Sequence, residues 1–386
     1  MRTIAIVTGT RADWGLLMPL AKALSLADGI AVPIVAANMH LMPEYGMTVN
    51  EITDAGFEVA ARVPMRVGGD APADRVRAMG RCMDEIADAF TSVKPDAVII
   101  LGDRYEMLAV ASAAAVMRIP IIHIAGGEIS EGAVDDEIRH AITKLSTLHL
   151  TATEPYRHRV IQMGEQPDRV VNTGAIGVWN AFNTPLLSAG ELGRELDLDL
   201  SLPTAVVTFH PATADASASP AAQMENMLQV LGEMKDMNIV ITYPNNDAGG
   251  AALIPLIERF AAENPRNVRA VRSLGMKRYQ SLLRLASVVV GNSSSGIVEA
   301  PSAGVPTVDI GIRQRGRIAA PSVIHCGTSA DEIRRAVAKA LSPGMQALAA
   351  RKENPYYKTD TLRIMTDAVL CFVAALPVGP KKFYDI

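Results

Sequence analysis

The sequence predicts an α/β protein made of two doubly wound, parallel-sheet domains in series. Short β-branched runs alternate with Ala- and Leu-rich stretches of helical length throughout the 386 residues. The runs are continuously apolar, which is typical of parallel strands covered by helices on both faces. This alternation is interrupted once, between residues 182 and 203, by an acidic stretch containing Pro and Gly. Because domains average roughly 150 residues, the length also favours two domains.

The first half is expected to form one sheet, with helices between successive strands. We place the first domain at residues 1–181, followed by a connector at 182–203. The predicted strands are Thr3–Val7, Val32–Ala36, Ala97–Leu101, Pro120–Ile124, Leu148–Thr151 and Val170–Thr173. The predicted helices are Leu16–Ala27, Val76–Phe90, Glu106–Met117 and Asp136–Ser146.

The second half repeats the pattern, and we place the second domain at residues 204–365. Two domains of similar size imply a cleft between them, which is where a ligand is expected by default. The predicted strands are Ala205–Phe209, Ile239–Thr242, Val268–Val271, Ser287–Val290 and Pro306–Ile310, and the helices are Pro220–Lys235, Leu253–Asn264 and Asp331–Leu341.

Composition and charge exclude several classes of protein. With 49% hydrophobic and 20% charged residues, the chain is neither disordered nor fibrous. A net charge of −4 without a basic stripe argues against nucleic-acid binding. Cys82, Cys326 and Cys371 form no CxxC pair, so we expect no zinc site and a reducing cytoplasm. The longest apolar stretch, Met107–Met117, is too short to span a membrane, for which about 20 residues are needed.

A glycine turn follows the first strand. It reads Thr8-Gly9-Thr10-Arg11-Ala12-Asp13-Trp14-Gly15 and leads into a helix. The free N–H groups of such a turn attract anions, and Arg11 would add a forked phosphate donor. The spacing matches neither the dinucleotide fingerprint nor the P-loop. Phosphate binding and a tight turn with a surface arginine are therefore both open interpretations of this motif.

Three acids are predicted to meet at one edge of the first sheet. Asp103 and Glu128 each follow a buried strand, and Asp135 lies at the start of the next helix. Asp103 has an alternative interpretation as the N-cap of the helix beginning near Glu106. Because carboxyl ends of parallel strands share an edge, we expect the three acids to converge. Clustered carboxylates tune each other's pKa and can serve as acid, base and cation stabiliser.

The second half offers nucleotide-binding candidates at its own strand ends. His210 follows one strand, and the turn Ser293-Ser294-Ser295 follows another and opens a helix. Backbone N–H groups and hydroxyls in such a turn suit a diphosphate. Glu299, one turn further on, is placed to accept both hydroxyls of a ribose. Three arginines follow a later strand: Arg313, Arg315 and Arg317. They could neutralise phosphate or lie in solvent, and the sequence does not indicate which of them points toward the site.

Taken together, the motifs resemble the hydrolysing UDP-N-acetylglucosamine 2-epimerases of sialic-acid-type biosynthesis. They are TGTRADWGLL, LGDRYEML, HIAGGEISEGAVDDEIRHAITKLS, TFHPAT, TYPNNDAGG and GNSSSGIVEAPSAGVP, and they extend from residue 3 to beyond residue 325. The resemblance implies the GT-B fold, with two Rossmann-like domains facing a cleft. It also implies that the C-terminal helix, here Thr366–Leu376 within 366–386, packs back on the first domain.

The resemblance assigns roles to matching positions. Asp103, Glu128 and Asp135 match the family's catalytic carboxylates, and Glu299 matches its ribose-binding acid. Its diphosphate contacts match Arg11, His210, Ser293, Ser294 and Ser295. Relatives often carry a lysine shortly after the equivalent of Arg11, which this chain lacks. The acid of the non-hydrolysing relatives' HVEAG motif falls at Ala125, with Glu128 nearby, and this favours the hydrolysing branch.

The implied reaction converts UDP-N-acetylglucosamine into N-acetylmannosamine and UDP by elimination to a glycal and rehydration. The same reaction on a UDP-linked 2,4-diacetamido-2,4,6-trideoxyglucose, leading to legionaminic acid, is the alternative. A non-hydrolysing epimerase, a glycosyltransferase and a non-catalytic sugar-nucleotide sensor are further alternatives. We expect no cofactor, no metal, a cytoplasmic location and, because two-fold assembly is common, a homodimer.

Overall fold

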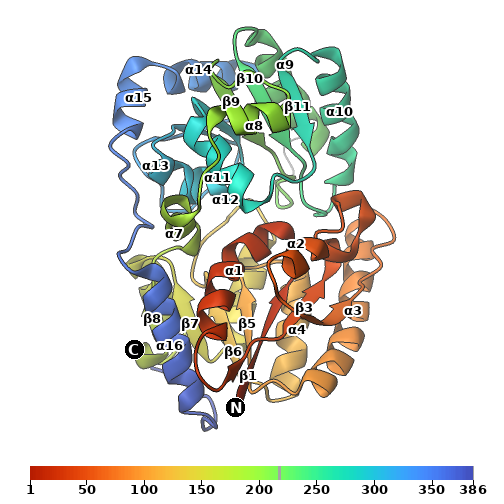
Figure 1. The fold of residues 1–386 in the computed structure, drawn as a ribbon, viewed down its shortest axis with the longest axis vertical. Helices are drawn as coiled ribbons and strands as arrows, with labels where there is room; N and C mark the ends of the chain where they lie inside the picture. The colour runs from red at the N-terminus through yellow and green to blue at the C-terminus, as the bar shows by residue number, and fades with distance from the viewer. Residues whose placement is uncertain (216–218, 386) are drawn as a thin grey trace. The chain divides into compact units, whose positions relative to one another are not determined.

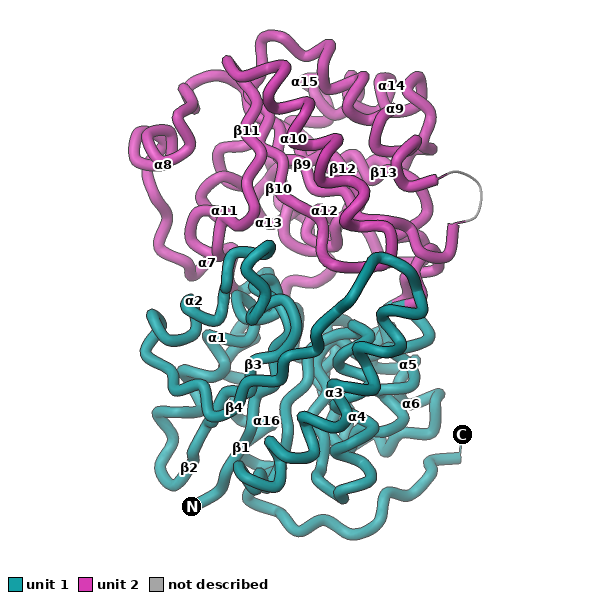
Figure 2. Tube along the Cα trace, turned by 90° about the vertical axis from the view of Figure 1, so that its right-hand side faces the viewer, with its two compact units in different colours: residues 1–128, 135–179, 358–386 teal, residues 129–134, 180–357 magenta. Residues whose placement is uncertain are grey.

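The computed structural model describes residues 1–215 and 219–385, and the chain separates into two compact units (Figure 2). Unit 1 comprises Met1–Glu128, Asp135–Trp179 and Lys358–Ile386, whose last residue lies outside the described part. Unit 2 comprises Ile129–Val134 and Asn180–Tyr357. Each unit contains a parallel sheet and surrounding helices, so the predicted fold class is confirmed.

The sheet of unit 1 has the strand order β4-β3-β1-β5-β6-β7-β8, and β2 pairs with β1 (Figure 1). All pairings within it are parallel. The strands are β1 (Arg2–Thr8), β2 (Ile30–Ala31), β3 (Ile34–Ala37), β4 (Val59–Val63), β5 (Ala97–Leu101), β6 (Ile121–Ile124), β7 (Leu148–Thr151) and β8 (Val170–Asn172). The helices are α1 (Arg11–Ser25), α2 (Val49–Asp54), α3 (Pro72–Val93), α4 (Tyr105–Val116), α5 (Asp135–Leu145), α6 (Glu154–Gln162), α7 (Ile176–Asn183), which crosses into unit 2, and α16 (Thr361–Ala374).

Alternate side chains of the unit 1 strands enter different apolar clusters. Ile4 and Ile6 of β1 pack with residues of α1 and α16, whereas Ala5 and Val7 pack with residues of α3, α4 and α5. The strands therefore need apolar residues at consecutive positions, which explains their unbroken runs in the sequence. The C-terminal helix α16 contributes Met365, Val369, Phe372 and Val373 to the first of these clusters.

The sheet of unit 2 has the strand order β11-β10-β9-β12-β13-β14, again entirely parallel. Its strands are β9 (Thr204–Thr208), β10 (Asn238–Thr242), β11 (Val268–Val271), β12 (Val288–Gly291), β13 (Thr307–Ile310) and β14 (Val323–Cys326). Its helices are α8 (Ala189–Leu196), α9 (Pro220–Glu233), α10 (Ile254–Glu263), α11 (Gly275–Leu285), α12 (Ser294–Val298), α13 (Ala300–Ala303), α14 (Ala330–Ala340) and α15 (Pro343–Ala349).

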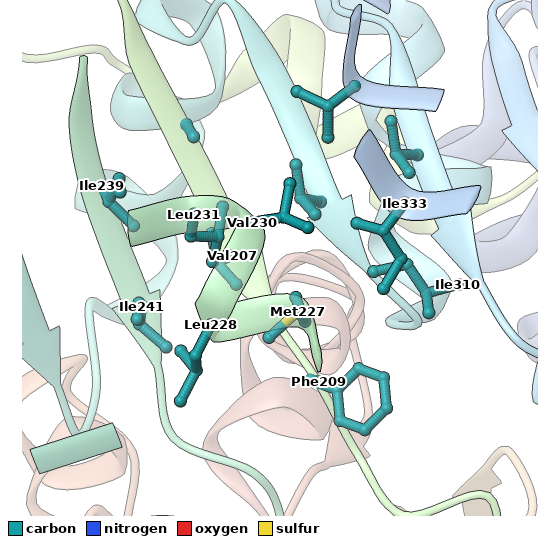
Figure 3. Packing of buried hydrophobic residues seen from close by; sticks show 14 of the residues in the cluster. Val207, Phe209, Met227, Leu228, Val230, Leu231, Ile239, Ile241, Ile310 and Ile333 are labelled. Carbon is teal, nitrogen blue, oxygen red and sulfur yellow. The ribbon is translucent and has the colours of Figure 1, made fainter. Parts of the chain in front are cut away.

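The core of unit 2 also has two faces. Figure 3 shows one of them, where Val207 and Ile239 of the sheet lie beside Met227, Leu228 and Leu231 of α9. The opposite cluster includes Val206 and Val240, together with Leu192 and Leu196 of α8. Helix α8 thus packs on the sheet of unit 2, although it lies within the stretch 182–203 expected to be a connector.

The eleven strands predicted along the chain are present, with ends shifted by up to two residues. The prediction missed β2, β4 and β14. In β4 exposed and half-buried residues alternate, and β14 has one exposed and two half-buried residues. Because β4 and β14 end the strand orders of their sheets, neither is covered like the central strands, and a search for unbroken apolar runs overlooks them.

In each sheet, successive strands are added first on one side of the first strand and then on its other side. In unit 1 this change of side lies between the paired strands β1 and β5, and in unit 2 between β9 and β12. Open α/β sheets bind ligands at the carboxyl ends of the strands beside such a switch point. In the described part of the chain, no helix is long and apolar enough to cross a membrane.

Candidate active site

The predicted acids of unit 1 lie at the carboxyl ends of neighbouring strands. Asp103 is the second residue after β5, Glu128 follows β6, and Asp135 is the first residue of α5. Strands β5 and β6 are adjacent and parallel. Glu128 is 5% exposed, and Asp103 and Asp135 are half-buried. The structure therefore places the three acids in the same region of one unit, beside its switch point.

Arg139 links the segments that carry these acids. Its side chain, 1% exposed, extends from α5, and its guanidinium donates to Asp103 Oδ2. It also donates to Asp136 Oδ1 at 3.1 Å and to the carbonyl of Glu128 at 3.0 Å. A planar guanidinium with five donors can hold three acceptors in a fixed arrangement. Arg139 therefore fixes the loops after β5 and β6 relative to the start of α5.

Asp103 does not cap the following helix. The N-cap of α4 is Arg104, which makes no side-chain capping bond, and the carboxylate of Asp103 instead pairs with Arg139. The interpretation of Asp103 as an N-cap is therefore wrong. Asp103 is held by a cation 36 residues away in the sequence, which no local rule for helix starts would reveal.

A sharp turn after β6 orients Glu128. Ala125 and Gly127 both have left-handed backbone conformations, with φ of 67° and 80°. A Cβ on Gly127 would lie 2.5 Å from the carbonyl oxygen of Tyr156, so glycine is required there by space as well as by conformation. The preceding His123 is buried, donates through Nε2 to the Gly102 carbonyl at 2.7 Å, and has its pKa lowered to about 3 by burial. His123 is thus a neutral structural residue.

The turn after β1 carries two ionisable residues. Arg11 is the first residue of α1 and is half-buried; burial lowers the pKa of its guanidinium, while Glu51 raises it. Asp13 accepts from the N–H of Gly9 at 3.3 Å. Burial raises the pKa of Asp13 to about 7; Glu106 adds to this rise and Arg104 opposes it. A buried carboxyl group with a raised pKa, two residues after Arg11 in the sequence, is a further acid–base candidate.

In unit 2, His210 and Asn292 join the two strands at the switch point. The N–H of His210 donates to Asn292 Oδ1 at 2.7 Å, and Asn292 Nδ2 donates to the His210 carbonyl at 2.8 Å. His210 Nδ1 accepts from the N–H of Asn245 at 3.3 Å. Because Nδ1 is an acceptor, the neutral imidazole carries its hydrogen on Nε2, which makes Nε2 a donor to any anion it meets.

The three serines after β12 have different environments. Ser293 is the N-cap of α12 and accepts from the N–H of Ser295, while Ser294 is exposed. The Ser295 hydroxyl accepts from Tyr279 at 2.7 Å and donates to Glu299 Oε2. A hydroxyl has one hydrogen, so in this arrangement Ser295 has none left for a phosphate. The structure thus distinguishes Ser295 from Ser293 and Ser294, whereas the sequence pattern predicts a shared diphosphate role for all three.

Glu299 lies where α12 ends and α13 begins, and it is half-buried. Gln280 Nε2 donates to its Oε1 at 3.3 Å, and Ser295 donates to its Oε2. Burial raises the pKa of Glu299 to about 7, although both hydrogen bonds lower it. The carboxyl group is therefore more readily protonated than an exposed glutamate.

The arginines after β13 are also distinguished by their contacts. Arg313 Nη1 donates to the Asn292 carbonyl at 3.2 Å, next to the serine turn. Arg315 pairs with Glu131 at 2.7 Å, and Arg317 lies 3.4 Å from Ser130 Oγ. Arg313 is therefore the arginine beside the nucleotide-binding candidates, while the other two hold the segment 129–134.

Sequence reasoning missed several of these residues. Arg139, Asp13 and Asn292 all lie inside the motifs quoted above, but each is influenced by a group far away in the sequence: Asp103, Arg104 and His210, respectively. The available signal was position alone, because each stands just after a buried strand or one turn into the next helix. Within 1–215 and 219–385, no group of three or more His, Cys, Asp or Glu side chains could hold a metal ion.

A family model described as UDP-N-acetylglucosamine 2-epimerase matches residues 22–370. The chain belongs to this family. A hydrolysing GDP/UDP-N,N'-diacetylbacillosamine 2-epimerase from Campylobacter jejuni is 35% identical over 84% of each chain. The polysialic acid biosynthesis protein P7 of Escherichia coli is 34% identical over 100% of this chain and 98% of its own.

Solved structures of family members share the fold. The UDP-GlcNAc 2-epimerase of Neisseria meningitidis, solved with UDP-GlcNAc, has a TM-score of 0.78 at 16% identity, covering 96% of this chain and 100% of the other. The enzyme of Methanocaldococcus jannaschii, solved with UDP-GlcNAc and UDP, has a TM-score of 0.73 at 14% identity, covering 96% and 99%. These structures support a GT-B-like fold for this family member.

Proposed function

We propose that this epimerase is a hydrolysing enzyme that converts UDP-N-acetylglucosamine into free N-acetylmannosamine and UDP. The observation that carries the proposal is the set of acids around Arg139 beside the switch point of unit 1. Glycosyl-bond cleavage through an oxocarbenium-like transition state typically uses Asp or Glu side chains that flank the bond being cleaved. Asp103, Glu128 and Asp135 are the proposed catalytic carboxylates.

In the first step, the bond between C1 and the UDP oxygen breaks, and its electron pair leaves with UDP. One carboxylate removes the C2 proton, and the C2–H electron pair forms the C1=C2 double bond of a 2-acetamidoglycal. Water then adds its hydroxyl to C1, while C2 receives a proton on the opposite face, which inverts that centre. Positive charge at C1 develops early, and facing carboxylates stabilise it.

The leaving diphosphate requires donors, and the proposed donors are Arg11, His210, Ser293 and Ser294. Arg11 offers a forked cation, and His210 offers an Nε2–H donor, because the bond from the Asn245 N–H to Nδ1 puts the hydrogen on Nε2. Arg313 joins this group because it lies at the Asn292 carbonyl, next to the serines. Glu299 is the proposed ribose-binding acid.

A second candidate substrate is UDP-2,4-diacetamido-2,4,6-trideoxyglucose. It is favoured by relatives from Campylobacter jejuni and Legionella pneumophila, 35% and 33% identical, that are named hydrolysing N,N'-diacetylbacillosamine 2-epimerases. The two substrates differ at C4 and C6, far from the nucleotide. Initial rates on both substrates, measured side by side, decide between them.

Incubation in deuterated water tests the reaction itself. We expect free sugar with one deuterium at C2, and ¹⁸O placed in the bridging C1–O position should be recovered entirely in UDP. Protium retained at C2 would contradict the glycal route. A product still attached to UDP would indicate a non-hydrolysing epimerase, and product formed only with an added acceptor would indicate a glycosyltransferase. UDP-sugar binding without turnover would indicate a sensor.

A further inference from the structure

A chain of hydrogen bonds in unit 2 ends on the carboxylate of Glu299. The Tyr279 hydroxyl, from α11, donates to Ser295 Oγ at 2.7 Å, and Ser295 donates to Glu299 Oε2. The next residue of α11, Gln280, donates through Nε2 to the other oxygen, Oε1, at 3.3 Å. Gln280 is 3% exposed, and Tyr279 is half-buried. Both carboxylate oxygens are therefore held by side chains: Oε1 by Gln280 of α11, and Oε2 by Ser295 of α12, which is itself held by Tyr279 of α11.

The number of acceptor sites on the Glu299 carboxylate indicates which kind of ligand it can bind. Two carboxylate oxygens offer about four lone-pair sites. Ser295 and Gln280 occupy one site on each oxygen, which leaves one site on each for a ligand. Two adjacent hydroxyl donors, one for each oxygen, match that pattern, and the 2′ and 3′ hydroxyls of a ribose are such a pair.

These hydrogen bonds also fix the orientation of the Glu299 side chain. An unrestrained glutamate would lose rotamer freedom when it binds a ligand, and that loss weakens affinity. Burial raises the pKa of Glu299 to about 7, and the two hydrogen bonds act against this rise, so they also favour the ionised form that accepts hydroxyl donors.

We propose that Tyr279, Ser295 and Gln280 are positioning residues that hold Glu299 for the ribose hydroxyls, so that discrimination between ribose and deoxyribose diphosphates depends on them. This inference rests on the proposed function, because it assumes that unit 2 binds UDP through Glu299. It gives Ser295 a different role from Ser293 and Ser294: Ser295 acts on the ribose through Glu299, and not on the diphosphate.

The test compares the affinities of UDP and 2′,3′-dideoxy-UDP by calorimetry. The wild type should bind UDP at least about tenfold more tightly, because only UDP can donate to Glu299. Tyr279→Phe, Ser295→Ala and Gln280→Leu should each reduce this ratio at least about threefold, mainly by weakening UDP. Tyr243→Phe is the matched control, since it removes a phenol that donates to another carboxylate of unit 2, Glu258, at 2.7 Å. Its ratio should stay at the wild-type value.

Each outcome decides a separate point. If Tyr279→Phe, Ser295→Ala and Gln280→Leu, or those of them that fold, keep the wild-type ratio, the inference is overturned while the proposed function stands. If Ser295→Ala weakens both ligands equally, Ser295 contacts the diphosphate and its positioning role is overturned. A wild-type ratio near one overturns the ribose role of Glu299 and the inference with it. If the wild type does not bind UDP at all, the proposed function fails, and this inference fails with it.

Discussion

At the scale of single residues, one buried cation organises the acids of unit 1. Arg139 pairs with Asp103 and Asp136 and holds the backbone of Glu128. A buried arginine is costly unless acceptors surround it, so the three contacts also explain why it tolerates burial. Asp103 and Asp136 are in this way held by the same residue that they neutralise.

Amide substitutions test the chemical role of these acids. Asp103→Asn, Glu128→Gln and Asp135→Asn should each lower kcat by at least about 100-fold, because acid–base groups typically contribute ~10²–10⁴-fold. Steady-state kinetics and thermal unfolding should show the loss without global unfolding. Glu137→Gln, at an exposed position of the same helix, is the control and should retain wild-type activity. Wild-type kcat in all three amide variants would contradict the proposed mechanism.

The raised pKa of Glu299 leads to a pH-dependent affinity. The ionised form accepts the ribose hydroxyls, so UDP binding should lower the pKa from about 7. UDP affinity should therefore weaken as the pH falls below about 7, by up to about tenfold per pH unit until the pKa of the complex is reached. Calorimetry between pH 5 and 8 measures this slope.

Glu299→Gln separates this effect from the titration of UDP itself. The terminal phosphate also titrates near pH 6, but it does so equally with either protein. The variant should bind UDP more weakly at pH 8 and with a shallower pH slope. Identical slopes for the two proteins would show that Glu299 does not titrate with binding.

At the scale of elements, the turns after the strands place the functional side chains. The turn after β6 combines left-handed conformations at Ala125 and Gly127, and the N–H of Gly102, after β5, donates to the carbonyl of Ile124 at 2.9 Å. The ends of β5 and β6 are thus joined by a hydrogen bond, which helps to fix the orientation of the residues that follow them.

Gly127→Ala should disturb this turn. Its φ of 80° is unfavourable for alanine, and the added Cβ would lie 2.5 Å from the Tyr156 carbonyl oxygen. We expect a destabilisation of at least ~1 kcal/mol, together with reduced kcat because Glu128 is the next residue. Denaturant unfolding and kinetics check both effects. Gly80→Ala, a helical position with open space around the Cβ, should be neutral or stabilising; an equal loss there would contradict the explanation.

At the scale of the whole molecule, the chain passes between the units at more places than the connector. The segment 129–134 follows Glu128 and precedes Asp135, yet it belongs to unit 2. The N–H of Glu131 donates to the Arg315 carbonyl at 3.1 Å, and the N–H of Ala214 donates to the Gly132 carbonyl at 3.1 Å. Glu128 and Asp135, at either end of this segment, are therefore bonded directly to residues that belong to unit 2.

Gly132→Ala tests whether the position of the segment 129–134 within unit 2 matters for activity. A Cβ on Gly132 would overlap the Ile312 carbonyl, so the segment must move. Since backbone atoms cannot yield as a flexible side chain can, we expect lower thermal stability and a kcat reduced at least about tenfold. Gly190→Ala, where the Cβ meets open space, is the control. Full activity and stability in Gly132→Ala would show that the position of the segment 129–134 does not affect the function of Glu128 and Asp135.

The sequence by itself determined the fold class, most of the strands and the strand ends at which polar residues gather. This was possible because a strand covered on both faces must be apolar at every position, and because parallel strands present their carboxyl ends at one edge. Edge strands such as β4 and β14 lack that signal.

Only the tertiary structure decided which of these residues meet. Asp103 pairs with Arg139, Ser295 with Tyr279, and Arg313 with the carbonyl of Asn292. Each of these contacts joins elements well separated along the chain, and neither periodicity nor spacing encodes the distance between two such side chains. The structure also decided that 129–134 belongs to unit 2, because backbone contacts, not composition, assign a segment to its sheet.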